Sequence, residues 1–308
     1  MPRTAKGAIT LAEHEPRSPA RRRLGALVVL AMLGVVAVGG YAAVGYLRTL
    51  WAPEQCEVTA AGSTFQWAPD QASNAAAITA IAIKRDLPPR AATIAIATAM
   101  QESKVRNITY GDRDSLGLFQ QRPSQGWGTP EQILNPEYST NKFYDALVKV
   151  ENYTDMEITD AAQEVQRSAA GKAYAQHEAQ ARATASVLSG QTHAGMVCTL
   201  EDPAAPGDPR AVADLIEQDF GVTADVDGDT VTLSTDDEDL AWAVGSWGVA
   251  RAVDTGAVRV VVGDREWQRG MGDAARQWRT GEAPSADAPA VTIQIGRASC
   301  RERVCSTV

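Results

Sequence analysis

The chain contains few of the residues that build metal and redox sites. Its 308 residues include three histidines and four cysteines. His177 has no second histidine four positions later, as a helical zinc motif requires, and His193 has no acid or cysteine close to it in the sequence. We therefore expect no metal site and no cofactor.

The chain also lacks an excess of basic charge. Lysine and arginine number 29 against 38 aspartates and glutamates, a net charge of −9, so nucleic acid is not an expected partner. There is no glycine loop suited to phosphate and no ordered Ser-His-Asp set. The segment DVDGD, residues 225–229, imitates a calcium loop, but its glycine stands fourth where such a loop needs it sixth. An Asp-Gly hairpin turn without metal is the better interpretation.

Residues 24–47 carry no charged side chain. As a helix they would span about 36 Å, enough to cross a bilayer. Basic residues crowd segment 1–23, whereas Arg48 stands alone beyond the span, so the positive-inside rule predicts a cytoplasmic N-terminus. The prediction is a single-pass cell-membrane protein, anchored by this helix, with its bulk outside the cytoplasm. A cleaved signal peptide, with Gly-Tyr-Ala at 40–42 as its cleavage site, is the alternative.

The C-terminal residues 295–308 begin with IGRASCRERV, which one reading frame of a widely used sequencing-library adapter encodes. We interpret them as an assembly artefact. Cys56 and Cys198 then remain, one at each end of the first predicted domain, and in an exported chain they are expected to form a disulfide.

Two folded domains joined by a linker are expected after the anchor. Residues 56–198 have mainly helical patterns, with two alanine-rich helices separated by Pro88-Pro89 and loops from 107 to 128. The composition of residues 199–209 indicates a linker, and residues 210–294 combine helical segments with a hairpin into a small α/β domain.

One acid, Glu102, lies at the end of the second alanine-rich helix. Burial and the negative end of the helix dipole would both favour its protonated form, as a general acid requires. A solvated glutamate at a surface turn is the plain alternative. The residues that follow it favour the first interpretation: Glu102-Ser103, Gly111-Asp112, then Gly117-Leu118-Phe119-Gln120.

This series resembles the lysozyme-like superfamily, most closely goose-type lysozymes and bacterial lytic transglycosylases. The resemblance implies a mainly α lysozyme-like (α+β) fold over residues 56–198, with Glu102 as catalytic acid/base and Asp112 as the carboxylate that could position water. Asp114 is a possible substitute for Asp112, because the acid that goose-type enzymes carry after the glutamine is missing. The candidate sugar-binding residues are Ser103, Tyr110, Gly117, Phe119, Gln120, Trp127 and, from a partial match to an Ala-Tyr-Asn segment, Tyr174.

Two functions follow from the resemblance. The first is cleavage of the glycan strands of peptidoglycan by a muramidase or lytic transglycosylase, with lytic cleavage assisted by the substrate's N-acetyl group favoured because the second acid is in doubt. The second is a non-catalytic protein that binds glycan or scaffolds a cell-envelope complex through the same cleft.

Overall fold

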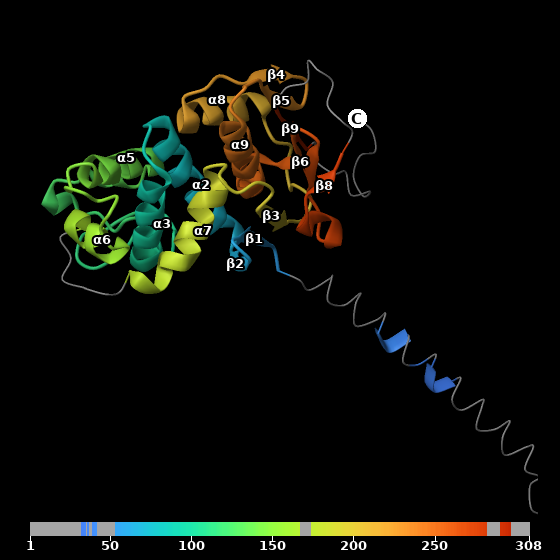
Figure 1. Ribbon diagram of the computed structural model, residues 1–308, viewed down its shortest axis with the longest axis horizontal. Helices are drawn as coiled ribbons and strands as arrows, with labels where there is room; N and C mark the ends of the chain where they lie inside the picture. The colour runs from blue at the N-terminus through green and yellow to red at the C-terminus, as the bar shows by residue number, and fades with distance from the viewer. Residues whose placement is uncertain are drawn as a thin grey trace, which may run out of the picture. The chain divides into compact units, whose positions relative to one another are not determined.

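The computed structural model describes residues 32–34, 36, 39–41, 53–166, 174–281 and 290–296 (Figure 1). The chain divides into two compact units, residues 1–52 and residues 53–308. The described residues of the first unit are helical.

No helix in the described part of the chain is both long and apolar enough to cross a membrane. This finding overturns the prediction of a transmembrane helix and, with it, the predicted membrane location. Most of the predicted span, 24–47, lies outside the described residues.

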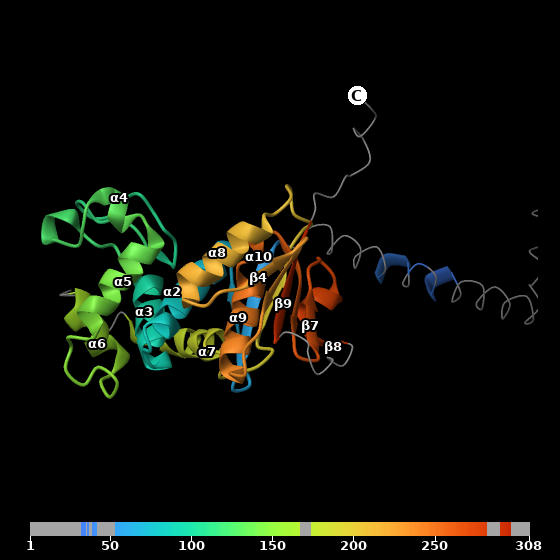
Figure 2. The same ribbon diagram turned by 90° about the horizontal axis from the view of Figure 1, so that it is seen from above.

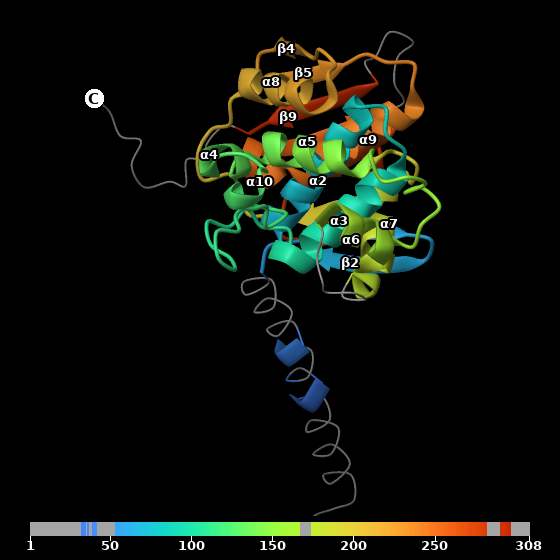
Figure 3. The same ribbon diagram turned by 90° about the vertical axis from the view of Figure 1, so that its left-hand side faces the viewer.

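Helices make up one side of the second unit, as Figures 2 and 3 show. Their bounds are α2 (Pro69–Lys84), α3 (Pro89–Ser103), α4 (Pro130–Ile133), α5 (Pro136–Leu147), α6 (Ile158–Gln166) and α7 (Glu178–Leu188), with 3-10 turns η1 (Pro123–Gln125) and η2 (Ala175–His177). The break at Pro88-Pro89 is confirmed, since proline at the start of α3 needs no amide partner there. Helix α3 packs against α2, α6 and α7. Its buried alanines offer little side-chain bulk, so neighbouring helices can approach it closely.

A three-stranded antiparallel sheet lies beside α7. It consists of β1 (Gln55–Ala60), β2 (Ser63–Trp67) and β3 (Met196–Thr199), in the order β2-β1-β3. Cys56 and Cys198 face each other across β1 and β3 and form a disulfide, which confirms the predicted pairing. The cross-link joins two strands that lie 142 residues apart in the sequence.

A six-stranded antiparallel sheet and three helices complete the unit. The helices are α8 (Pro209–Phe220), α9 (Glu238–Ala250) and α10 (Ala252–Thr255). The strands are β4 (Asp225–Asp227), β5 (Thr230–Leu233), β6 (Ala257–Val262), β7 (Arg265–Gln268), β8 (Arg279–Thr280) and β9 (Val291–Ile295), in the order β4-β5-β9-β6-β7-β8, with a 3-10 turn η3 (Asp273–Arg276). The Asp-Gly hairpin is confirmed between β4 and β5, where Gly228 has φ +60°. Ile295, the first residue of the predicted artefact, pairs with Ala257, and residues 297–308 lie outside the described part.

Helix α9 is apolar on all sides because it lies between two layers. It contacts α2 and α7 on one side and strands β6 and β9 on the other. Gly248 faces Ile293, where a Cβ atom would lie 2.9 Å from its Cδ1, so the helix lies close against the sheet. The segments 56–198 and 210–294, predicted as separate domains, therefore share a contact surface within one compact unit.

A buried ion pair fastens α8 to α9. The Asp219 carboxylate, 1% exposed, accepts hydrogen bonds from Trp247 Nε1 at 2.8 Å and from Arg251 Nη1 at 2.7 Å. Burial raises the pKa of Asp219, and the Arg251 guanidinium opposes that rise. Removal of either partner would leave the other charge buried and unpaired.

The predicted fold class is wrong in its proportions. The described residues form a mixed helix and sheet protein, 48% helical and 17% strand, rather than a mainly α lysozyme-like domain behind a membrane helix. Strand β1 was not among the elements expected from the sequence. Its pairing with β3 depends on a segment more than a hundred residues away, which no local pattern reveals.

Candidate active site

Helix α3 ends immediately after Glu102 because the backbone turns left-handed there. Lys104 has φ 56° and Val105 has φ 55°, and the Val105 amide donates to the carbonyl of Ala99 at 2.9 Å. A positive φ is strained for a β-branched residue such as valine. Such strain is concentrated at functional sites in proteins, and here it directly follows the candidate acid.

Glu102 is half-buried and has one buried partner. The hydroxyl of Tyr174 donates to Glu102 Oε1 at 2.8 Å, and Tyr174 itself is 0% exposed. Burial raises the pKa of the Glu102 carboxyl, and the hydrogen bond from Tyr174 works against that rise. The structure thus brings Glu102, the expected catalytic acid, together with Tyr174, the candidate from the partial Ala-Tyr-Asn match.

The loop after α3 is tied to the helix by Ser103. Its hydroxyl donates to the carbonyl of Leu118 at 2.7 Å, and the side chain of Gln166 in α6 donates to the carbonyl of Phe119, also at 2.7 Å. Ser103 is 7% exposed, so it serves the loop rather than an open surface.

The Gln120 side chain stabilises the same loop by contacts with its backbone. Gln120 adopts φ 48°, and its Nε2 lies 3.3 Å from the carbonyls of both Tyr110 and Gly117. A Cβ atom on Gly111 would lie 1.8 Å from Gln120 Oε1, so the amide fits directly against this glycine. The Tyr110 side chain, in contrast, is 72% exposed.

Gly117 is required for packing. Its φ is +75°, and a Cβ atom there would lie 2.8 Å from the carbonyl oxygen of Ile133 in α4. The close approach expected for a sugar ring is made by the protein's own backbone.

The two aromatic candidates lie in different places. Phe119 is 0% exposed and stacks on Phe143 in the core, with ring centroids 4.6 Å apart. Trp127 lines a cavity of about 920 Å³ beside α5 and α6, together with Lys142 and Glu164.

Neither aspartate accompanies Glu102. The side chain of Asp112 is 92% exposed and lies 3.9 Å from Arg113. Asp114 accepts hydrogen bonds from Arg122 at 2.7 Å and from the Ser124 amide at 2.8 Å, which hold its pKa well below the usual range. Within the described residues, no hydrogen bond or ion pair joins either carboxylate to Glu102.

A group of glutamines, none of them expected from the sequence, surrounds a cavity that includes Gln101, the residue before Glu102. This glutamine pocket, about 490 Å³, is lined by Gln66, Trp67, Gln71, Met100, Gln101, Lys104, Gln176, His177 and Gln180. Gln101 Oε1 lies 3.3 Å from Gln176 Nε2 and 3.1 Å from His177 Nε2. Burial lowers the pKa of His177, so the imidazole is neutral near pH 7.

The glutamine amides are oriented by their neighbours. Gln180 Nε2 donates to the carbonyl of Gln66 at 3.1 Å, which leaves the Gln180 side-chain oxygen as an acceptor. Gln101 accepts through its oxygen, which leaves its NH₂ group as a donor. Lys104 is the single formal charge among the lining residues at neutral pH, so the pocket suits an uncharged ligand rich in hydroxyl and amide groups. Gln176 and Gln180 are four residues apart in the sequence, a spacing that could have indicated that the two side chains share one surface.

No protein-family model matches the chain, and comparison with curated proteins finds no similar sequence.

Proposed function

We propose that this protein cleaves the glycan strands of peptidoglycan, with Glu102 as the general acid and base. The observation that carries the proposal is the Glu102–Tyr174 pair at the end of α3, where burial raises the pKa of a carboxyl that stays half-exposed. The motif resemblance around residues 102–120 supports the choice of a glycan.

In this mechanism the protonated Glu102 donates its proton to the glycosidic oxygen as the bond to the anomeric carbon breaks. The Tyr174 hydroxyl binds Oε1, which leaves Oε2 for the substrate. A hydrogen bond to a carboxylate is stronger than one to a neutral carboxyl group. Tyr174 therefore stabilises Glu102 most after the proton has left, which is the condition for lowering the barrier.

The anomeric carbon needs a nucleophile other than a protein carboxylate as the glycosidic bond breaks. Asp114 is held by Arg122 and Ser124, and Asp112 points into solvent. The carbonyl oxygen of the substrate's N-acetyl group can attack the anomeric carbon instead and form a cyclic oxazolinium ion. The Glu102 carboxylate then takes a proton from the sugar's own 6-hydroxyl in lytic cleavage, or from water in hydrolysis, as that oxygen attacks the anomeric carbon and the bond from this carbon to the N-acetyl oxygen breaks.

The glutamine pocket supplies a place for a neighbouring sugar. Gln101 belongs to the pocket and precedes Glu102, and Gln176 and His177 come shortly after Tyr174. Amide donors and acceptors match the hydroxyl and N-acetyl groups of amino sugars.

The test is digestion of purified peptidoglycan by the full chain, with mass analysis of the soluble products. Glu102→Gln should lose about a hundred- to ten-thousandfold in rate, because an amide cannot deliver the proton. Glu157→Gln, at an exposed position, is the matched control and should retain the wild-type rate. Products ending in a 1,6-anhydro ring would support the lytic route, and reducing ends would support hydrolysis. Equal rates for wild type and Glu102→Gln would refute the assignment.

A glycan-binding role without cleavage is the second candidate. It is favoured by one observation: Asp112 is exposed and Asp114 is held by Arg122 and Ser124, so neither carboxylate assists Glu102. Retention of the folded wild-type protein on peptidoglycan, with no soluble fragments released, would select this role.

A further inference from the structure

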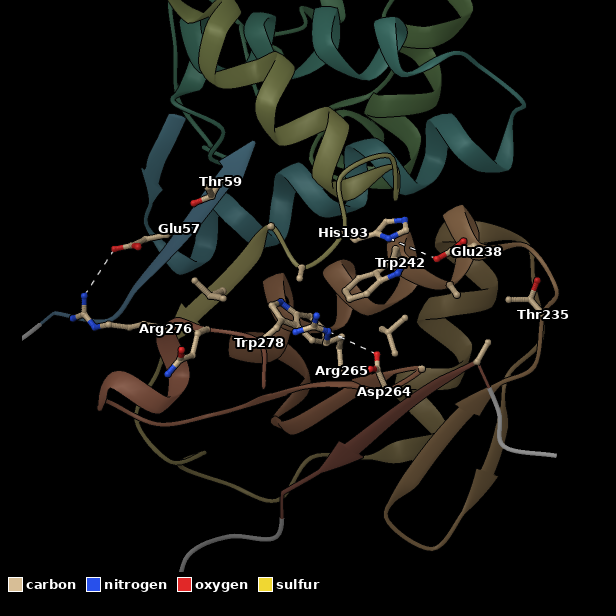
Figure 4. A pocket seen from close by; sticks show the side chains of 18 of the residues that line it. Glu57, Thr59, His193, Thr235, Glu238, Trp242, Asp264, Arg265, Arg276 and Trp278 are labelled. Carbon is tan, nitrogen blue, oxygen red and sulfur yellow. Dashed lines mark ion pairs between the residues drawn. The ribbon is translucent and has the colours of Figure 1, made fainter. Parts of the chain in front are cut away.

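A separate cavity of about 810 Å³ lies between the three-stranded sheet and α9 with strands β6 and β7 (Figure 4). We call it the tryptophan cavity. The residues that matter for its chemistry are His193, Trp242, Glu238, Trp278, Arg276 and Glu57. None of these residues belongs to the candidate active site.

Three aromatic rings form its floor and hold one another. His193 stacks on Trp242 with centroids 4.9 Å apart, and Trp242 meets Trp278 edge-on at 5.2 Å. The indole Nε1 of Trp278 donates to the carbonyl of Met196 in β3 at 2.8 Å. Trp242 is 6% and Trp278 8% exposed, so the floor is apolar and fixed but offers no open ring face on which a sugar could stack.

Charges of both signs surround this floor, and they include Arg265, whose Nε lies 3.7 Å from Asp264 Oδ1. Figure 4 shows Arg276 with Glu57 at one end and Glu238 at the other, with the two tryptophans between them. Asp236, which also lines the cavity, adds a second carboxylate close in sequence to Glu238.

The ion pairs at the rim are loose. Arg276 Nη1 lies 3.9 Å from Glu57 Oε1, and His193 Nδ1 lies 3.7 Å from Glu238 Oε1. The Arg276 side chain is 42% exposed and that of Glu238 77%. Exposed pairs of this kind contribute little to stability, so a charged ligand can replace either partner at small cost.

This arrangement selects one class of ligand. Four carboxylates, of Glu57, Asp236, Glu238 and Asp264, outnumber the two lining guanidinium groups of Arg265 and Arg276, which disfavours nucleic acid and phosphates. In the segments that the structure describes, no group of three potential ligands could hold a metal ion. What remains is a dipolar molecule with an apolar middle.

We propose that the tryptophan cavity binds a short peptide with free amino and carboxyl ends. The peptide carboxylate pairs with the Arg276 guanidinium, whose planar fork matches two oxygens, and the ammonium group lies against Glu238 and Asp236. Small side chains of the peptide lie against the apolar floor between these charged groups. The proposal does not depend on Glu102 and stands if glycan cleavage is not observed.

The first experiment changes only the ligand, so it does not depend on the folding of any variant. Calorimetric titration of the full chain with tetraalanine should show one saturable site. N-acetyl-tetraalanine lacks the ammonium group and tetraalanine amide lacks the carboxylate, and each should bind about tenfold or more weakly. Equal binding of blocked and free peptides, or no binding of tetraalanine at millimolar concentration, would overturn the proposal.

The second experiment assigns each end. Arg276→Gln should weaken the binding of tetraalanine about as much as amidation of the peptide weakens its binding to the wild type. In this variant, amidation should cause no further loss of affinity. Glu238→Gln should behave in the same way toward N-acetylation. Arg279→Gln and Glu217→Gln, exposed and outside the cavity, are the matched controls and should bind like wild type. Losses that add independently, or equal losses in the controls, would contradict the assignment.

Discussion

Removal of the Tyr174 hydroxyl tests the proposed active site most directly. Tyr174→Phe keeps the ring in its fully buried position and deletes the group that donates to Glu102 Oε1 at 2.8 Å. Burial raises the pKa of Glu102, whereas this hydrogen bond lowers it. The variant should therefore have a Glu102 pKa that is higher still.

The magnitude follows from the nature of the lost bond. A hydrogen bond to a charged group contributes about 1.5–3 kcal/mol, and about 1.4 kcal/mol corresponds to a factor of ten. Because Glu102 is half-exposed, water replaces part of the lost interaction, and the lower end of this range applies. The carboxylate formed in the transition state loses the same stabilisation, so we expect kcat to fall about tenfold.

The assay is the pH dependence of peptidoglycan solubilisation by the full-length protein. In Tyr174→Phe the basic limb of the profile should move to higher pH, with KM unchanged, because the acid keeps its proton longer. Tyr153→Phe is a matched control at a half-buried tyrosine and should leave the profile in place. A Tyr174→Phe profile that matches the wild type in both limbs and in rate would refute the role given to this pair.

Three further predictions concern stability. Glu102→Gln should raise the melting temperature at neutral pH, because folding raises the pKa of Glu102 and the stability that comes with its protonation is lost as the pH rises through that pKa. In melting curves taken across pH, the difference between variant and wild type should vanish well below pH 4.5, the ordinary pKa of the group. Reduction of Cys56–Cys198 should cost about 5 kcal/mol in denaturant unfolding by the chain-entropy account, and a change below about 1 kcal/mol would contradict it. Asp219→Ala should destabilise by about 3 kcal/mol, because it leaves a buried arginine without its partner, whereas Asp214→Ala, exposed on the same helix, should stay within about 0.5 kcal/mol.

Local patterns predicted much of the secondary structure. Proline marked the start of α3, an Asp-Gly pair marked the turn between β4 and β5, and helical segments were expected where α8 and α9 lie. The three-stranded sheet was missed because β1 and β2 are short and are completed by β3, far along the chain. A strand is stabilised by its neighbours, so its sequence alone is a weak signal.

The candidate site divides in the same way. The series of residue types over positions 102–120 indicated Glu102 as the candidate acid. No local pattern could indicate that Phe119 packs on Phe143 or that the Gln120 side chain fits against Gly111. A residue type states which contacts are possible, and the surrounding elements decide which contact is made.

By itself the sequence determined the break between α2 and α3, the acid at the end of α3 and, by elimination, the disulfide between Cys56 and Cys198. The tertiary structure alone decided that Tyr174 meets Glu102 across 72 residues, and that residues of β1 and α9 line one tryptophan cavity. The physical reason is range. Propensity and periodicity act over a few neighbouring residues, whereas burial, pKa and cavity shape depend on segments that only the packed core brings together.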